Sequence, residues 1–379
     1  MSRKLIVFTA YTTVGMLGVY MTLFQYTILD MTRFFLPGIA MMGGLIGVQS
    51  LGMGISPLVF GGLSVRLGKR KVILIAYLLL IAGTLAIGLT PWLALFVVAA
   101  FVTGAGFSVL EATLCAVLAD EFPEKSIRHL NFSQVFFSIG AMIGPVIVRG
   151  LIDAGFFFKG LFYFCSLIFA LLCITFFFTK QSNDSVNAES GDAVSCFVGL
   201  MKSRIFLLLA AFMMIYVGVE ACIANFSGSY FELVLDNPEL SAAALSLFWG
   251  AMIPARVIAG MQKIDTKTIM VYSMIIVLAG VFGAMLLPWR PVKLVMFALC
   301  GFGCGPLWPM TMNESAKKSL GSSGLIMNSL VVFGSIGGAV FPFFSGILAS
   351  AASQTQVYYL CGIATVALLV LYLRSVKGE

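Results

Sequence analysis

Long apolar runs alternate with short polar breaks from one end of the chain to the other. An α-helix needs about 20 residues to cross the hydrocarbon core of a bilayer, and twelve of the apolar runs are long enough. The pattern predicts an all-α membrane protein with twelve transmembrane helices. The predicted spans cover residues 5–29, 38–60, 72–90, 92–118, 131–151, 156–179, 205–231, 241–262, 268–288, 291–312, 322–350 and 356–373.

The composition supports a membrane protein and leaves little room for a soluble domain. Of the 379 residues, 60% are hydrophobic and 10% are charged, whereas globular proteins carry about 25% charged residues. The single histidine, His129, cannot form a metal site alone, and no His, Ser or Cys constellation suggests an enzyme. A phosphate-binding GxxxxGK[ST] loop is missing from the sequence, so we expect an ion gradient, with no cofactor, to supply the energy.

The longest polar break, residues 180–204, is rich in Ser, Asn, Asp and Gly and divides the spans into six and six. Two six-helix halves joined by a linker are typical of transporters built from repeated halves. We therefore predict two six-helix bundles, residues 1–180 and 205–379, with a cytoplasmic linker at 181–204.

The loop "GGLSVRLGKRKVIL" (61–74), between the second and third spans, resembles the glycine-led basic loop of the major facilitator superfamily. Val65 stands where that family has an aspartate, so the charge relay that locks the loop to a neighbouring helix is not expected in its usual form. A plain positive anchor is the alternative interpretation. The corresponding turn in the second half, residues 254–267, has a weaker similarity to this loop through Arg256, Gly260 and Asp265. The residues that the resemblance assigns to conformational gating are Gly62, Arg66, Gly68 and Arg70, beside Lys69.

The basic residues predict the orientation. With the N-terminus inside, 18 of the 23 Lys and Arg residues fall on cytoplasmic segments, as the positive-inside rule requires. Both termini are then cytoplasmic, and we expect a bacterial inner-membrane protein. The charges lie at scattered loop ends, which argues against nucleic-acid binding. The basic residues left for the opposite side are Arg33, Arg149, Lys159, Arg290 and Lys293.

Two carboxylates lie inside predicted spans, Glu111 in the fourth and Glu220 in the seventh. A charged side chain near the bilayer centre costs about 2.5–3.5 kcal/mol by insertion scales. Desolvation raises the pKa of a carboxyl group towards neutrality, so such a group can load and release a proton. The alternative is a structural role, with the carboxylate held by an arginine or by backbone groups.

Residues 104–141 resemble the fucose–galactose–glucose:proton symporter family. "GAGFSVLEATLCAVLAD" is similar to that family's fourth span, and "RHLNFSQVFFSIGA" to its fifth. The resemblance implies that Glu111 couples protons and that Gln134 contacts sugar. Two departures, Asp30 lying late in the first span and Phe137 replacing an expected Asn, favour a substrate other than fucose.

A neutral sugar needs hydrogen-bonding groups and aromatic faces. Amides within or at the ends of spans supply the first, at Gln25, Asn131, Asn225 and Asn328, and rings supply the second, at Tyr216 and Trp308. Helix packing or lipid contact is the alternative role for the rings. In the tenth span, Pro306 and Pro309 rule out a straight helix and suggest a hinge or gate.

The sequence therefore predicts a secondary transporter that imports a small neutral sugar with a proton by alternating access. We expect a monomer whose partners are the sugar, protons and the bilayer. The remaining alternatives are a proton-driven exporter of drugs or metabolites and a sodium-coupled sugar symporter.

Overall fold

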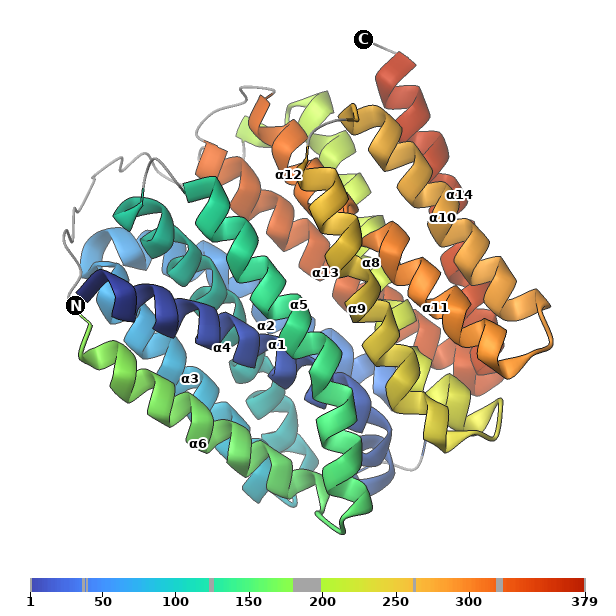
Figure 1. The fold of residues 1–379 in the computed structure, drawn as a ribbon, viewed down its shortest axis with the longest axis horizontal. Helices are drawn as coiled ribbons and strands as arrows, with labels where there is room; N and C mark the ends of the chain where they lie inside the picture. Colours follow the sequence, from blue (N-terminus) through green and yellow to red (C-terminus); the bar gives the residue numbers. More distant parts are fainter. Residues whose placement is uncertain are drawn as a thin grey trace. The chain divides into compact units, whose positions relative to one another are not determined.

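The computed structural model describes residues 2–35, 38, 40–122, 126–179, 199–261, 264–317 and 323–377. Within these ranges the regular structure is helical (Figure 1). The elements are α1 (Ser2–Phe35), α2 (Ala40–Leu67), α3 (Lys69–Leu89), α4 (Leu93–Glu121), α5 (Ser126–Asp153), α6 (Phe158–Phe177), α8 (Arg204–Leu233), the 3-10 helix η2 (Pro238–Leu240), α9 (Ser241–Gly260), α10 (Thr266–Leu286), α11 (Arg290–Cys304), α12 (Leu307–Lys317), α13 (Ser323–Ala351) and α14 (Gln354–Lys377).

The helices confirm the all-α membrane fold. Eleven segments of the described residues are long and apolar enough to cross a membrane. The 28-residue helix α2 carries one charged residue, Arg66, close to its end, and it matches the remaining predicted span. The tenth predicted span is interrupted, because α11 ends at Cys304 and α12 begins at Leu307. The prediction that the prolines prevent a straight helix is therefore confirmed.

The chain divides into two compact units. Unit 1 comprises Met1–Asp30 and Val48–Ser190, and unit 2 comprises Met31–Gly47 and Gly191–Glu379. The end of α1 and the start of α2 thus belong with the second unit. Most of the predicted linker, 181–204, lies outside the described residues.

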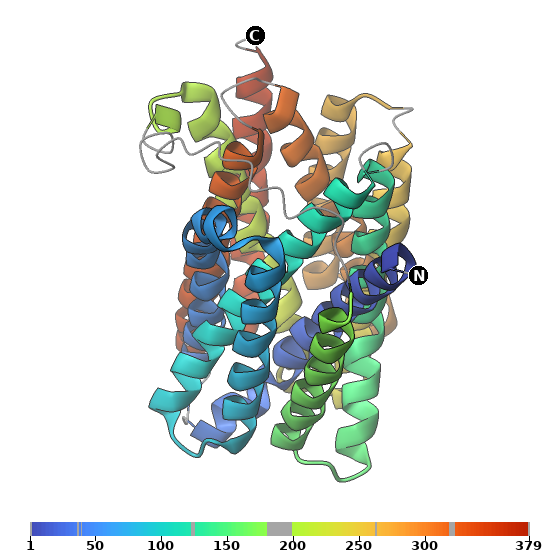
Figure 2. The ribbon, with the colours of Figure 1, turned by 90° about the vertical axis from the view of Figure 1, so that its left-hand side faces the viewer.

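In unit 1, α3 packs against both α4 and α6, and α4 packs against α5 (Figure 2). Glycine lets α1 and α5 approach closely: a Cβ on Gly140 would lie 2.0 Å from the Gly15 carbonyl oxygen. A Cβ on Gly104 of α4 would likewise lie 2.1 Å from the carbonyl oxygen of Gln49 on α2. Small residues drive such contacts in membranes, where apolar faces gain little from leaving lipid.

Glycines also allow close helix contacts in unit 2, where α8 packs most extensively against α13. A Cβ on Gly337 would lie 1.8 Å from the Met214 carbonyl oxygen, and one on Gly301 would lie 1.9 Å from that of Phe248. The interpretation of "GSIGG" (334–338) as a packing motif is confirmed at Gly337.

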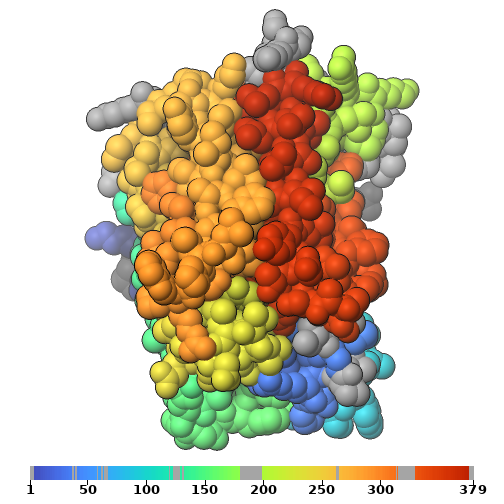
Figure 3. Space-filling model, turned by 90° about the vertical axis from the view of Figure 1, so that its right-hand side faces the viewer, coloured from blue at the N-terminus to red at the C-terminus, as the bar shows by residue number. Residues whose placement is uncertain are grey.

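In unit 2, α10 lies beside α14 (Figure 3), and both helices expose large apolar side chains. Tyr272 of α10 is 61% exposed and Ile363 of α14 is 67% exposed. A face of this kind is suited to the hydrocarbon of a bilayer.

Candidate functional site

The first candidate site is built by α4 and α5 of unit 1. Gln134 donates a hydrogen bond from Nε2 to Oε1 of Glu111 at 3.1 Å, and both side chains are partly buried. One turn further along α4, the Cys115 sulfur lies 3.8 Å from the hydroxyl of Ser133. The same faces of the two helices therefore meet over at least one turn. Two residues that the sequence assigned to proton coupling and sugar contact are brought together.

The backbone around Gln134 is fixed by local contacts. Ser138 donates to the Gln134 carbonyl at 3.0 Å, and Gly140 holds α5 close to α1. Two other predicted ligands lie on the same helices or their neighbours. Asn131 is in α5, with its side chain outside the described residues, and Gln25 of α1 is 5% exposed.

The second candidate site is built around α8 of unit 2. The Tyr216 hydroxyl donates to the carboxylate of Glu220, one turn further along the same helix. The same hydroxyl lies 3.3 Å from the Cys304 carbonyl oxygen at the end of α11. Tyr216 is 1% exposed. Tyr216, which was predicted to contact substrate, lies between Glu220 and the break that separates α11 from α12.

The break has a chemical cause. Proline has no N–H to donate to the carbonyl four residues earlier, so Pro309 leaves the Gly305 carbonyl without its helical donor. Arg256 of α9 donates from Nε to that carbonyl at 3.3 Å. Arg256 also interacts electrostatically with Glu220. In the sequence Arg256 falls among the loop charges, with no sign of this contact. Pro309 indicates which carbonyl loses its helical donor but not which side chain replaces that donor.

The other predicted ligands of unit 2 are more dispersed. Asn225 is buried and donates from Nδ2 to the Ala221 carbonyl of its own helix at 2.8 Å. Trp308 is partly exposed in the first turn of α12. Asn328 lies in α13, with its side chain outside the described residues. Glu111 belongs to unit 1 and Glu220 to unit 2.

The basic loop is held to neighbouring helices even though Val65 stands where the family has an aspartate. Gly68 has φ of 84°, a left-handed conformation that favours glycine, at the N-cap of α3. Lys69 forms an ion pair with Asp120 at the end of α4. Arg70 donates to the Phe177 carbonyl of α6 at 2.7 Å. The loop thus binds two neighbouring helix ends. Gly62 and Arg66 lie in α2, with side chains outside the described residues.

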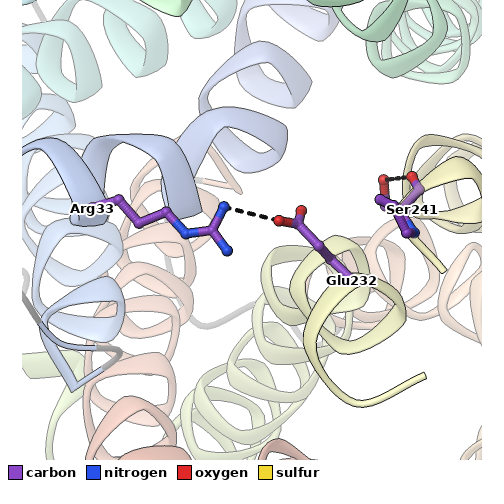
Figure 4. A network of polar contacts seen from close by, with 4 residues as sticks. Arg33, Glu232 and Ser241 are labelled. Carbon is purple, nitrogen blue, oxygen red and sulfur yellow. Dashed lines mark hydrogen bonds and ion pairs between the residues drawn. The ribbon is translucent and has the colours of Figure 1, made fainter. Parts of the chain in front are cut away.

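Within the described part of the chain, four of the five basic residues predicted on the non-cytoplasmic side donate to an acceptor named below. Arg33 pairs with Glu232 of α8 at 2.9 Å within unit 2 (Figure 4), and Arg149 pairs with Asp153 at 2.7 Å. Lys159 donates to the Thr90 carbonyl at 2.6 Å, and Lys293 donates to the Ala284 carbonyl. Both lysines are buried beside the C-terminal ends of neighbouring helices, which favour positive charge.

No group of three His, Cys, Asp or Glu residues that could hold a metal ion occurs among the described residues. What the two sites offer is hydrogen bonding: a carboxylate facing an amide in unit 1, and a carboxylate, a phenol and a guanidinium in unit 2. Such groups can bind polyhydroxylated molecules and exchange protons.

Comparison with known proteins agrees with this architecture. The family model described as Major Facilitator Superfamily matches residues 5–327. The chain is 26% identical to the glucose/mannose transporter GlcP of Bacillus subtilis over 74% of this chain and 71% of that protein. It is 25% identical to multidrug resistance protein D of Escherichia coli over 88% and 84%. The crystal structure of a variant of the E. coli fucose:proton symporter FucP superposes with a TM-score of 0.69 and 17% identity, covering 98% of each chain.

Proposed function

Because the chain belongs to the major facilitator superfamily, we propose that it imports a small neutral, hexose-like sugar together with a proton. The chain is an integral membrane transporter of this superfamily and not an enzyme. Likeness to a glucose/mannose transporter supports the sugar, and likeness in fold to a fucose:proton symporter agrees with it. The observation that carries the proposal is the hydrogen bond between Gln134 and Glu111.

This pair links a proton to a sugar by simple chemistry. An ionised carboxylate accepts the Gln134 amide in a charge-assisted hydrogen bond, which is about twice as strong as a neutral one. When Glu111 takes up a proton, that bond weakens and the amide hydrogens become available to a sugar hydroxyl. Sugar binding and proton uptake then favour one another, and release of the proton favours release of the sugar.

In this cycle the sugar and proton enter from outside and are released on the cytoplasmic side. Neutral Glu111 lowers the cost of closing a site around it, since an unpaired buried charge is unfavourable. Glu220 is the second coupling candidate, in series with Glu111. The charge distribution supports cytoplasmic termini, and we assign the chain to a bacterial inner membrane with a monomer as the working unit.

The test is uptake of radiolabelled glucose, galactose, mannose and fucose into proteoliposomes under an inward proton gradient. We expect accumulation of one sugar, and loss of that accumulation in Glu111→Gln while exchange at equal concentrations survives. Glu239→Gln is the matched control, because Glu239 is exposed in η2. Loss of both activities together would mean that Glu111 is needed for binding and not for coupling.

Two alternatives are separated by the same vesicles. Accumulation driven by a sodium gradient alone would identify sodium, and not the proton, as the coupling ion. Export is favoured by the likeness to multidrug resistance protein D. Proton-driven efflux of a lipophilic cation, with no uptake of any sugar, would overturn the import proposal in favour of that function.

A further inference from the structure

The Tyr216 hydroxyl faces two oxygen atoms but has one hydrogen to give. It donates to the Glu220 carboxylate, and it lies 3.3 Å from the Cys304 carbonyl oxygen. A phenol can donate a single hydrogen bond while accepting others. The distance to Cys304 exceeds the usual 2.5–3.0 Å of an O–H···O bond. The hydrogen of Tyr216 is therefore committed to Glu220.

The carbonyl of Cys304 lies at a weak point of the fold. It ends α11, and the next two residues, Gly305 and Pro306, form the turn before α12. Pro306 and Pro309 remove the helical N–H donors of the Phe302 and Gly305 carbonyls, which flank Cys304. Two side chains from other helices lie at this break: Tyr216 beside the Cys304 carbonyl, and Arg256 on the Gly305 carbonyl at 3.3 Å.

We propose that Tyr216 is a positioning residue that couples the protonation of Glu220 to the break between α11 and α12. An ionised carboxylate can only accept, so it keeps the Tyr216 hydrogen. A protonated Glu220 can donate its own O–H to the phenol oxygen. The Tyr216 hydrogen then rotates, without leaving its oxygen, and donates to the Cys304 carbonyl.

Arg256 acts in the same direction. Its guanidinium is attracted by the charge of Glu220 and is hydrogen-bonded to the Gly305 carbonyl. When Glu220 is neutralised, its attraction for the Arg256 guanidinium is lost, while the hydrogen bond from Arg256 to the Gly305 carbonyl remains. Proton uptake therefore strengthens both supports of the break, and proton release weakens both. The break is held when Glu220 is neutral and freed when it is charged.

The groups around Glu220 contain little else that could titrate in its place. Among the described residues, those that interact with it are Tyr216 on its own helix and Arg256 on α9, with Cys304 on α11 affected by its charge. The helices α12, α13 and α14 also pack on α8. They contribute no titratable group that acts on Glu220 in the described part of the chain.

This inference rests on the proposed function for the assignment of Glu220 to proton coupling, and its test uses no sugar. Trp308 lies in the first turn of α12, directly after the break, and is one of four tryptophans in the chain. A parent variant with Trp92→Phe, Trp249→Phe and Trp289→Phe keeps Trp308 as the sole tryptophan. Its emission is measured in detergent as the pH is changed.

We expect the Trp308 emission of the parent to change with pH, and Tyr216→Phe to abolish that change. Glu220→Gln should give a pH-independent emission equal to that of the parent at low pH, because an amide N–H2 can donate to the phenol as a protonated carboxyl does. Glu111→Gln should retain the change. The infrared band of the protonated Glu220 carboxyl is identified by its absence from Glu220→Gln. If this band still changes with pH in Tyr216→Phe, Glu220 still titrates in that variant.

Several results would overturn the proposed coupling between Glu220 protonation and the break. These are a pH-independent parent, a Tyr216→Phe variant that keeps the full change, or a Glu220→Gln variant that matches the parent at high pH. The comparison of Glu220→Gln with the parent tests the coupling even if Tyr216→Phe does not elute as a folded protein. If the Trp308 emission behaves as expected but no sugar is taken up, the coupling through Tyr216 stands and the sugar proposal alone is overturned.

Discussion

Gln134 on α5 donates its amide to the carboxylate of Glu111 on α4 across 3.1 Å. The two residues are 23 positions apart, and a polar break between two helices separates them in the sequence. Their contact converts a lone intramembrane carboxylate into one half of a donor–acceptor pair. In the proposed cycle, protonation of Glu111 frees the Gln134 amide to donate to a sugar hydroxyl.

Replacing Gln134 by Leu should weaken sugar binding while keeping the side-chain volume similar. A hydrogen bond between neutral groups contributes about 0.5–1.5 kcal/mol, so we expect the KM for the transported sugar to rise about two- to tenfold. Radiolabelled uptake at several sugar concentrations measures it. Gln356→Leu is the control, because Gln356 is exposed on α14. An unchanged KM in Gln134→Leu would exclude a sugar contact.

Gly337→Ala should destabilise unit 2. The added Cβ would lie 1.8 Å from the Met214 carbonyl oxygen, so α13 and α8 must separate, and overpacking costs about 1–3 kcal/mol. Gly150→Ala is the matched control, since nothing lies within 4 Å of its added Cβ. There the gain in helix propensity is about 0.5–1 kcal/mol. Thermal unfolding in detergent should show Tm lowered in the first variant and equal or raised in the second.

Asp265 should make the start of α10 sensitive to acid. Its carboxylate accepts from the backbone N–H groups of Lys267 at 3.0 Å and Thr268 at 3.2 Å. The hydrogen bonds from Thr268 hold the pKa of Asp265 below its usual value of 3.8. A lowered pKa adds stability that is complete above pH 3.8 and is lost as the pH falls through the folded-state pKa.

The measurement compares Tm for wild type, Asp265→Asn and Asp265→Ala. Asparagine is an equally good N-cap and carries no charge, whereas alanine provides no cap. We expect Asp265→Ala to have the lowest Tm above pH 3.8. The advantage of wild type over Asp265→Asn should shrink at lower pH. A constant difference between those two proteins would contradict the role of the charge.

The ion pair between Lys69 and Asp120 should contribute modestly to stability. Their side chains are 34% and 48% exposed, and exposed pairs are typically worth about 0.2–1 kcal/mol. A double-mutant cycle of Lys69→Ala and Asp120→Ala should give a coupling energy in that range that decreases in high salt. A coupling of zero at low salt would show that Asp120 does not replace the aspartate missing at Val65.

Features that depend on local chemistry could be read from the sequence. The lengths of the apolar runs predicted the helices, since the bilayer sets a minimum length for each span. Pro306 and Pro309 predicted the break before α12, because proline lacks the N–H that a helix needs. The unusual position of Glu111 and Glu220 was also visible, since a charge inside an apolar run is costly in any fold.

Only the tertiary structure decided which side chains meet. A transmembrane helix that is apolar on every side does not reveal which face packs against its neighbour, so spacing could not pair Glu111 with Gln134. Helix rotation and register brought Arg256 to the Gly305 carbonyl and Asp120 to Lys69. The sequence by itself determined where helices form and where they fail. Packing decided which polar groups share a hydrogen, because that depends on contacts between residues far apart in the chain.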